Sequence, residues 1–135
     1  MSLTDTLKGM GLSDQQAITV ETAVSESKRA GCMVEMVTLG DQLFIYRSLN
    51  RLEWKQIQKA LLNRAKGTDG NVDTTKVLEN KDEGEEEVVF KALLFPRYDT
   101  QSDLLHLPSG WVTTLADRIT ELSGFSNAAP EPTRL

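Results

Sequence analysis

The sequence is poor in the residues that build most catalytic and metal sites. The 135-residue chain has one cysteine, Cys32, and one histidine, His106. A lone cysteine excludes an internal disulfide and a multi-cysteine metal site, and no motif places a metal ligand or a general base beside His106. Phosphate-binding, dinucleotide-binding, serine-hydrolase and zinc-protease motifs are also absent. We therefore expect no enzyme activity, no cofactor and no metal.

Long apolar runs and blocks of positive charge are missing as well. No run reaches the roughly 18 apolar residues that suggest a membrane span, and residues 1–11 lack the apolar core of a signal peptide. Fifteen basic residues stand against 20 acidic ones, for a net charge of -5, which disfavours a nucleic-acid partner. We expect a soluble cytoplasmic protein with no membrane contact, whose acidic surface favours protein partners.

The clearest element that is present is a helix predicted over residues 108–125. Pro108 discourages a helix from entering from upstream, and Ser109 is the candidate N-cap. Gly124 supplies the left-handed residue that ends a helix, with Phe125 folding back onto the last turn. One apolar stripe follows the helical period and consists of Trp111, Leu115, Ile119 and Leu122. Another part of the protein must cover this stripe.

Residues 32–49 predict a β-hairpin that turns at Gly40 and Asp41, because this pair suits a two-residue turn. The turn sets four cross-strand pairs: Val34 with Arg47, Glu35 with Tyr46, Met36 with Ile45, and Val37 with Phe44. Both faces of this ribbon are largely apolar, and two strands alone are marginally stable. One face should pack on the helices of the domain. The other face either lies in the same core or needs a partner or more strands.

Three more segments predict helices. Residues 12–31 give a weak helix with a small apolar face, which should dock on a partner or on the core. Residues 50–66 begin with a capping pair, Asn50 and Glu53, and end before Gly67. Their predicted apolar side comprises Trp54, Ile57, Leu61 and Leu62.

The third segment is residues 85–96, which Pro96 should end. Its inward residues are predicted to be Val88, Val89, Ala92 and Leu93. The following loop, residues 97–107, is long for a compact domain and is a candidate contact surface.

Together these elements predict an α+β fold in which a β-hairpin, a small antiparallel sheet, packs against three to four short helices. We expect a flexible lead-in at residues 1–12 and a single domain at residues 13–125. Within that domain, glycines and an acidic run predict a mobile linker at residues 67–84. Residues 126–135 contain two prolines and no periodicity, so we expect a disordered tail.

The order of these segments resembles a family of small tail-assembly proteins of long-tailed bacteriophages. Its members are called tail assembly chaperones or, in phages resembling T4, baseplate hub assembly proteins. The resemblance covers roughly residues 43–125. Its marks in this sequence are Phe44, Ile45, Tyr46, Arg47, Leu49, Arg51, Glu53 and Trp54, then Glu87, Val88, Leu93, Leu94, Phe95 and Pro96, then Leu107, Pro108, Gly110, Leu115, Ile119, Ser123, Gly124 and Phe125.

This resemblance implies a non-enzymatic protein that binds a phage tail protein in the host cytoplasm during tail assembly. The client would be the tape-measure protein, whose apolar helical stripes need shielding, or a baseplate hub component. A homo-oligomer is also compatible with the sequence. The alternative function is a structural baseplate or tail-neck subunit that stays in the virion. A small enzyme or ligand-binding domain would require His106 or the acidic run to meet other ionisable groups.

Surplus apolar surface on the hairpin and helices would suit a protein that holds helical clients. We therefore expect the partner-binding residues to be Phe44, Tyr46, Trp54 and Trp111, flanked by the loop around Tyr98. Both tryptophans lie on apolar helical stripes, so core packing is the competing interpretation for them.

Overall fold

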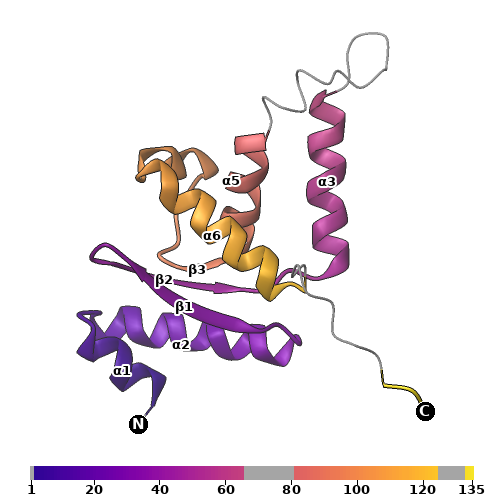
Figure 1. Ribbon diagram of the computed structural model, residues 1–135. Helices are drawn as coiled ribbons and strands as arrows, with labels where there is room; N and C mark the ends of the chain where they lie inside the picture. The colour runs from indigo at the N-terminus through magenta and orange to yellow at the C-terminus, as the bar shows by residue number, and fades with distance from the viewer. Residues whose placement is uncertain (1, 66–80, 125–132) are drawn as a thin grey trace.

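A computed structural model describes residues 2–65, 81–124 and 133–135. Helices cover both faces of a three-stranded antiparallel sheet (Figure 1), so the prediction of an α+β fold is confirmed. The strands lie in the order β1 (Val34–Leu39), β2 (Gln42–Arg47) and β3 (Leu93–Phe95). The predicted hairpin supplies β1 and β2. The sequence analysis did not predict β3.

The hairpin has the predicted register in all four pairs, from Val34 opposite Arg47 to Val37 opposite Phe44. Gly40 in its turn has a φ of +59°, and a Cβ there would lie 3.0 Å from Trp111 Cζ2. A side chain at this position would therefore strain the backbone and collide with the indole. The turn needs glycine for both reasons.

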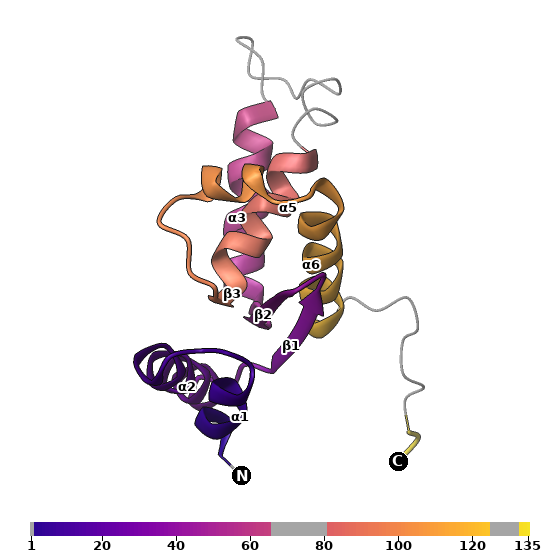
Figure 2. The same cartoon turned by 90° about the vertical axis from the view of Figure 1, so that its left-hand side faces the viewer.

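Both faces of the central strand β2 are buried by this chain. Phe44 and Tyr46 point to one side, into a core with α5 (Lys81–Ala92) and α6 (Ser109–Leu122). Leu43 and Ile45 point to the other side, against the N-terminal helices. Figure 2 shows the two helical layers on either side of the strands. On the second ribbon face, the β2 residues lie in the protein's own core, whereas Met36 of β1 is 47% exposed. The sheet also gains a third strand, the other possibility left open for this ribbon.

The N-terminal layer consists of α1 (Leu3–Gly9) and α2 (Asp14–Arg29). The side chain of Ser13 caps α2 in a capping box with Gln16, and Leu7 of α1 is completely buried. Residues 1–12 were predicted to be a flexible lead-in, and this prediction is wrong for the helical part. The small side chains of α2 leave room for Leu7, so a short polar segment gains a buried anchor.

The opposite layer contains α5 (Lys81–Ala92) and α6 (Ser109–Leu122). The four residues predicted to point inward from residues 85–96, Val88, Val89, Ala92 and Leu93, are all buried. However, α5 begins four residues earlier than predicted, inside the expected linker 67–84, and ends at Ala92. Residues 93–95 then pair with β2 as β3, because that edge of the sheet was still open. The remainder of the predicted linker, residues 67–80, lies outside the described residues.

Helix α6 carries the predicted stripe, with Leu115 and Ile119 fully buried, and Gly124 follows it with a φ of +101°. Ser109 is the first helical residue and Pro108 occupies the N-cap position without a side-chain hydrogen bond, so the predicted cap is wrong. The helix therefore begins one residue earlier than predicted, at Ser109. Phe125 and residues 126–132 of the predicted tail lie outside the described residues.

The segment predicted as a loop, residues 97–107, contains a 3₁₀ helix, η1 (Gln101–His106). Leu104 of η1 is buried, and this apolar anchor explains why the segment is ordered against α5.

Helix α3 (Arg51–Ala65) begins at the predicted capping pair, in which the Glu53 N–H donates to Asn50 Oδ1 over 2.8 Å. The Leu49 N–H donates to Ser123 Oγ over 2.8 Å, which joins the start of α3 to the end of α6. Farther along, a Cβ on Gly84 of α5 would lie 3.0 Å from Leu61 Cδ1. The glycine therefore lets α3 and α5 approach closely. Gly67, the predicted stop, lies outside the described residues.

Candidate functional site

Two of the five predicted partner-binding residues belong to the core. Phe44 is 0% exposed and Tyr46 is 1% exposed. The ring of Phe44 packs edge to face on Trp111, with centroids 5.8 Å apart. The prediction that Phe44 and Tyr46 lie on an accessible surface is wrong, because their face of β2 is covered by α5 and α6.

The hydroxyl of Tyr46 has a structural role. It donates a hydrogen bond of 2.7 Å to Glu35 Oε1, on the residue opposite it in β1. Burial, and then the hydrogen bond to Glu35, raises the pKa of Tyr46 above its usual value of 10.0. The hydrogen bond links β2 to β1 through their side chains, and the folded protein keeps the phenol protonated to a higher pH than the unfolded chain does.

The other three predicted residues, Trp54, Tyr98 and Trp111, are half-buried and pack against the core. Trp111 lies against Gly40 at the hairpin turn, near the start of α6. Trp54 lies in the first turn of α3, which starts beside the other end of α6 at Ser123. A 14-residue helix such as α6 is about 20 Å long, so the two indoles mark opposite ends of this layer.

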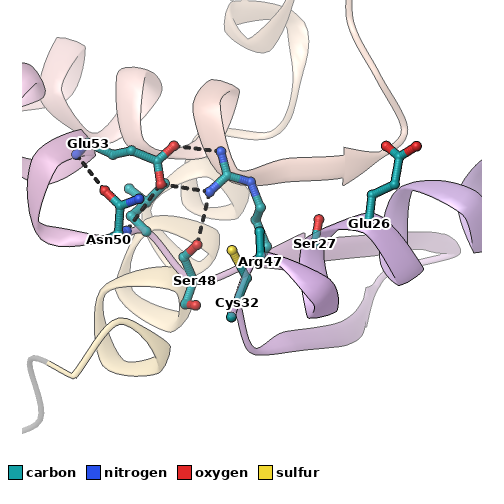
Figure 3. Close-up of a pocket in the computed structure, with 10 residues that line it drawn as sticks. Glu26, Ser27, Cys32, Arg47, Ser48, Asn50 and Glu53 are labelled. Carbon is teal, nitrogen blue, oxygen red and sulfur yellow. Dashed lines mark hydrogen bonds and ion pairs between the residues drawn. The ribbon is translucent and has the colours of Figure 1, made fainter.

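A hollow of about 420 Å³ opens where the end of α2 meets the junction between β2 and α3 (Figure 3). Its polar wall is an ion pair in which Arg47 Nη1 donates to Glu53 Oε1 over 2.9 Å and Nη2 donates to Oε2 over 2.7 Å. Arg47 also donates to the carbonyl oxygens of Ser48 and Lys91. The hydrogen bond from Arg47 lowers the pKa of Glu53. Each charge already has a partner, so this pair serves the fold.

The sequence analysis missed this ion pair, although the sequence contained a signal for it. Arg47 follows four strand residues that are all apolar or aromatic, and a buried guanidinium needs a carboxylate partner. Glu53 was assigned only to the helix cap, and it accepts hydrogen bonds in both roles.

The one cysteine and the one histidine lie on different parts of the fold. Cys32 is a free, half-buried thiol that lines the hollow near Arg47 (Figure 3), whereas His106 is exposed at the end of η1. Within residues 2–65, 81–124 and 133–135, no group of three or more His, Cys, Asp and Glu side chains could hold a metal ion. Among those residues, no helix is both long enough and apolar enough to cross a membrane.

Helix α3 carries two exposed leucines. Leu52 is 65% exposed and Leu62 is 48% exposed, although Leu62 was predicted to point inward. Helix α3 packs mainly against α5 and stands at the side of the molecule (Figure 1), so only a narrow face, centred on Ile57, is buried. This narrow contact explains the wrong prediction for Leu62.

Beside α3, an open hollow of about 430 Å³ is lined by residues of α3, of α5 and of the segment after β3. Its walls include Ile57, Phe90 and Arg97, whose guanidinium lies 5.6 Å from the centre of the Phe90 ring. We call the exposed outer face of α3, with Leu52 and Leu62, together with the hollow beside this helix, the α3 surface. It is suited to contact another helix.

The comparisons with known proteins give no family: no protein-family model matches the chain, and no curated protein or solved structure matches it.

Proposed function

We propose that this protein is a phage tail morphogenesis factor, a non-enzymatic assembly chaperone that binds a tail protein in the host cytoplasm. The client is the tape-measure protein or a baseplate hub component. Residues 43–125 supply the resemblance to the tail-assembly family, and the α3 surface supplies the physical argument.

The observation that carries the proposal is the apolar surface that α3 leaves exposed. An amphipathic helix normally buries a broad apolar face, yet α3 leaves Leu52 and Leu62 largely exposed. Trp54 and Leu61, which pack against the core from this helix, are only half-buried. Apolar side chains on a helix with one narrow contact favour packing against a second helical partner.

A tape-measure protein is a suitable client because its long helices carry apolar stripes that would aggregate before the tail tube surrounds them. Covering such a stripe removes apolar surface from water, and each Å² buried stabilises the complex by about 25 cal/mol. The acidic character of the chain, with a net charge of -5, would keep the complex in solution.

The test is co-expression with the tape-measure protein of the same genome, measuring the soluble fraction of that client. We expect the wild-type chain to raise the soluble fraction, and the double variant Leu52→Glu and Leu62→Glu to lose this effect while keeping its circular dichroism spectrum. The matched control is Ile18→Glu on α2, where Ile18 is 54% exposed on the other side of the sheet. Equal solubility with wild type and double variant would contradict a role for the α3 surface.

Mass spectrometry of purified virions separates this function from the alternative, a structural baseplate or tail-neck subunit. An assembly chaperone should be absent or scarce in the finished particle. A stoichiometric amount would replace the chaperone proposal with the structural one.

A further inference from the structure

A second surface lies on the far side of α5 from the α3 surface. A groove of about 200 Å³ runs between α5, η1 and the first turns of α6, which lie together in the upper part of Figure 1. The buried side chain of Leu104 and the half-buried side chains of Leu107 and Val112 form an apolar floor. Leu105 stands at its edge and is 65% exposed.

Carboxylates form the rim of this groove. Asp82, Glu85 and Glu86 line it, and the described residues that line it include no lysine or arginine. Asp82 lies in the first turn of α5, where a negative charge favours the helix dipole. Glu85 and Glu86 lie beyond the first turn of α5, so the helix dipole does not account for all three carboxylates on the rim.

The charges on the rim repel one another. Burial, and then the carboxylates of Glu83, Asp82 and Glu85, raises the pKa of Glu86. Glu85 Oε2 accepts a hydrogen bond of 2.6 Å from the Thr113 hydroxyl, which holds its carboxylate beside the floor. A positive charge bound at the rim would relieve this repulsion.

We propose that this groove, which we call the acidic groove, docks a basic amphipathic segment of another polypeptide. Leucine-like side chains of the segment cover Leu104, Leu105 and Val112, and its lysines or arginines pair with Glu85 and Glu86. Anionic ligands and anionic membranes are disfavoured by the same carboxylates. The inference concerns partner chemistry and does not depend on the partner being a tail protein.

The test uses the full chain and two synthetic helical peptides of about 18 residues, long enough to form a helix. One peptide carries leucines along one face with lysines beside them, and the other has glutamate in place of every lysine. Fluorescence anisotropy at low salt should show binding of the Leu/Lys peptide, weakened by added salt, and no binding of the Leu/Glu peptide.

Variants locate the binding. Glu85→Gln with Glu86→Gln should weaken binding about tenfold, as expected for two partly buried ion pairs. The amide oxygen introduced at position 85 can still accept the Thr113 hydrogen bond, so the change removes charge and keeps this contact. Leu105→Ser should weaken binding as well. The matched control is Glu21→Gln with Glu26→Gln on α2, which changes the net charge equally and should leave the affinity unchanged.

Three outcomes would overturn the proposal. An equal loss of peptide affinity in the Glu85/Glu86 and Glu21/Glu26 double variants would show only a general attraction of the basic peptide to an acidic protein. Equal binding of both peptides would show that the rim does not select charge. Self-association in sedimentation experiments that Leu105→Ser abolishes would assign the groove to a second copy of this chain.

Discussion

Arg47 and Glu53 form a two-pronged ion pair that fixes the direction in which the chain leaves the sheet. Arg47 is the last residue of β2 and Glu53 lies in the first turn of α3. Glu53 Oε1 also accepts the Asn50 N–H over 3.1 Å, so one carboxylate serves both the ion pair and the helix cap. The orientation of α3, and with it the α3 surface, depends on this carboxylate.

Replacing Glu53 by glutamine should destabilise the fold at neutral pH by ~1–3 kcal/mol, because the pair is largely buried and Arg47 loses its counter-charge. The side chains of Arg47 and Glu53 are only 18% and 16% exposed. Arg47 lowers the folded-state pKa of Glu53 below its usual 4.5. The stabilisation is therefore complete above pH 4.5 and is lost as the pH falls through the lowered pKa.

Chemical denaturation at pH 7 and in steps below about pH 4.5 would measure this difference. The control is Glu121→Gln, because Glu121 pairs with Arg118 at 3.8 Å on the open surface and should contribute less than about 1 kcal/mol. If the difference in free energy of unfolding between wild type and Glu53→Gln stayed constant as the pH falls, the role of the ionised pair would be refuted.

Gly40→Ala should lower the stability by roughly 1–2 kcal/mol, the cost of a side chain in the left-handed conformation, with a further cost from contact with Trp111. Thermal unfolding would measure the loss, and tryptophan fluorescence would report displacement of the indole. Gly110→Ala in α6 is the control, because no described atom beyond its neighbours lies within 4 Å of the added Cβ and alanine favours a helix. Similar destabilisation by both changes would contradict the special role of Gly40.

Tyr46→Phe should cost roughly 0.5–1.5 kcal/mol at neutral pH through loss of the hydrogen bond to Glu35. The raised pKa of Tyr46 also makes an alkaline prediction. Above pH 10.0, the usual value, the unfolded chain releases the phenolic proton while the folded chain holds it, so the wild-type advantage falls as the pH rises. Chemical denaturation between neutral pH and about pH 11 would measure the free energy of unfolding of both proteins. A difference between them that stays constant over this range would contradict the mechanism.

The sequence predicted those features that depend on neighbouring residues. The turn at Gly40 set the whole hairpin register, because strand pairing follows from turn length. Asn50 and Glu53 located the start of α3 for the same local reason. The apolar residues on both sides of β2 also indicated that both faces of this strand would be buried.

Features that depend on distant segments were not predicted. Leu93 was expected to face inward from a helix that Pro96 ends. It forms part of β3 instead, because β2 offers an open edge far away in the sequence. Phe44 and Tyr46 were expected at a binding surface because nothing local indicates that α5 and α6 cover them. Leu62 and Leu105 have the sequence character of core residues, and only the final packing leaves them exposed.

Hydrogen–deuterium exchange on the chain alone and in complex with its tape-measure client would locate the client contact. We expect new protection in α3 and the adjacent part of α5, around Ile57 and Phe90, with α1 and α2 unchanged. Protection confined to α1, α2 and β1, or no complex between the purified proteins, would contradict the proposal that the α3 surface holds another polypeptide.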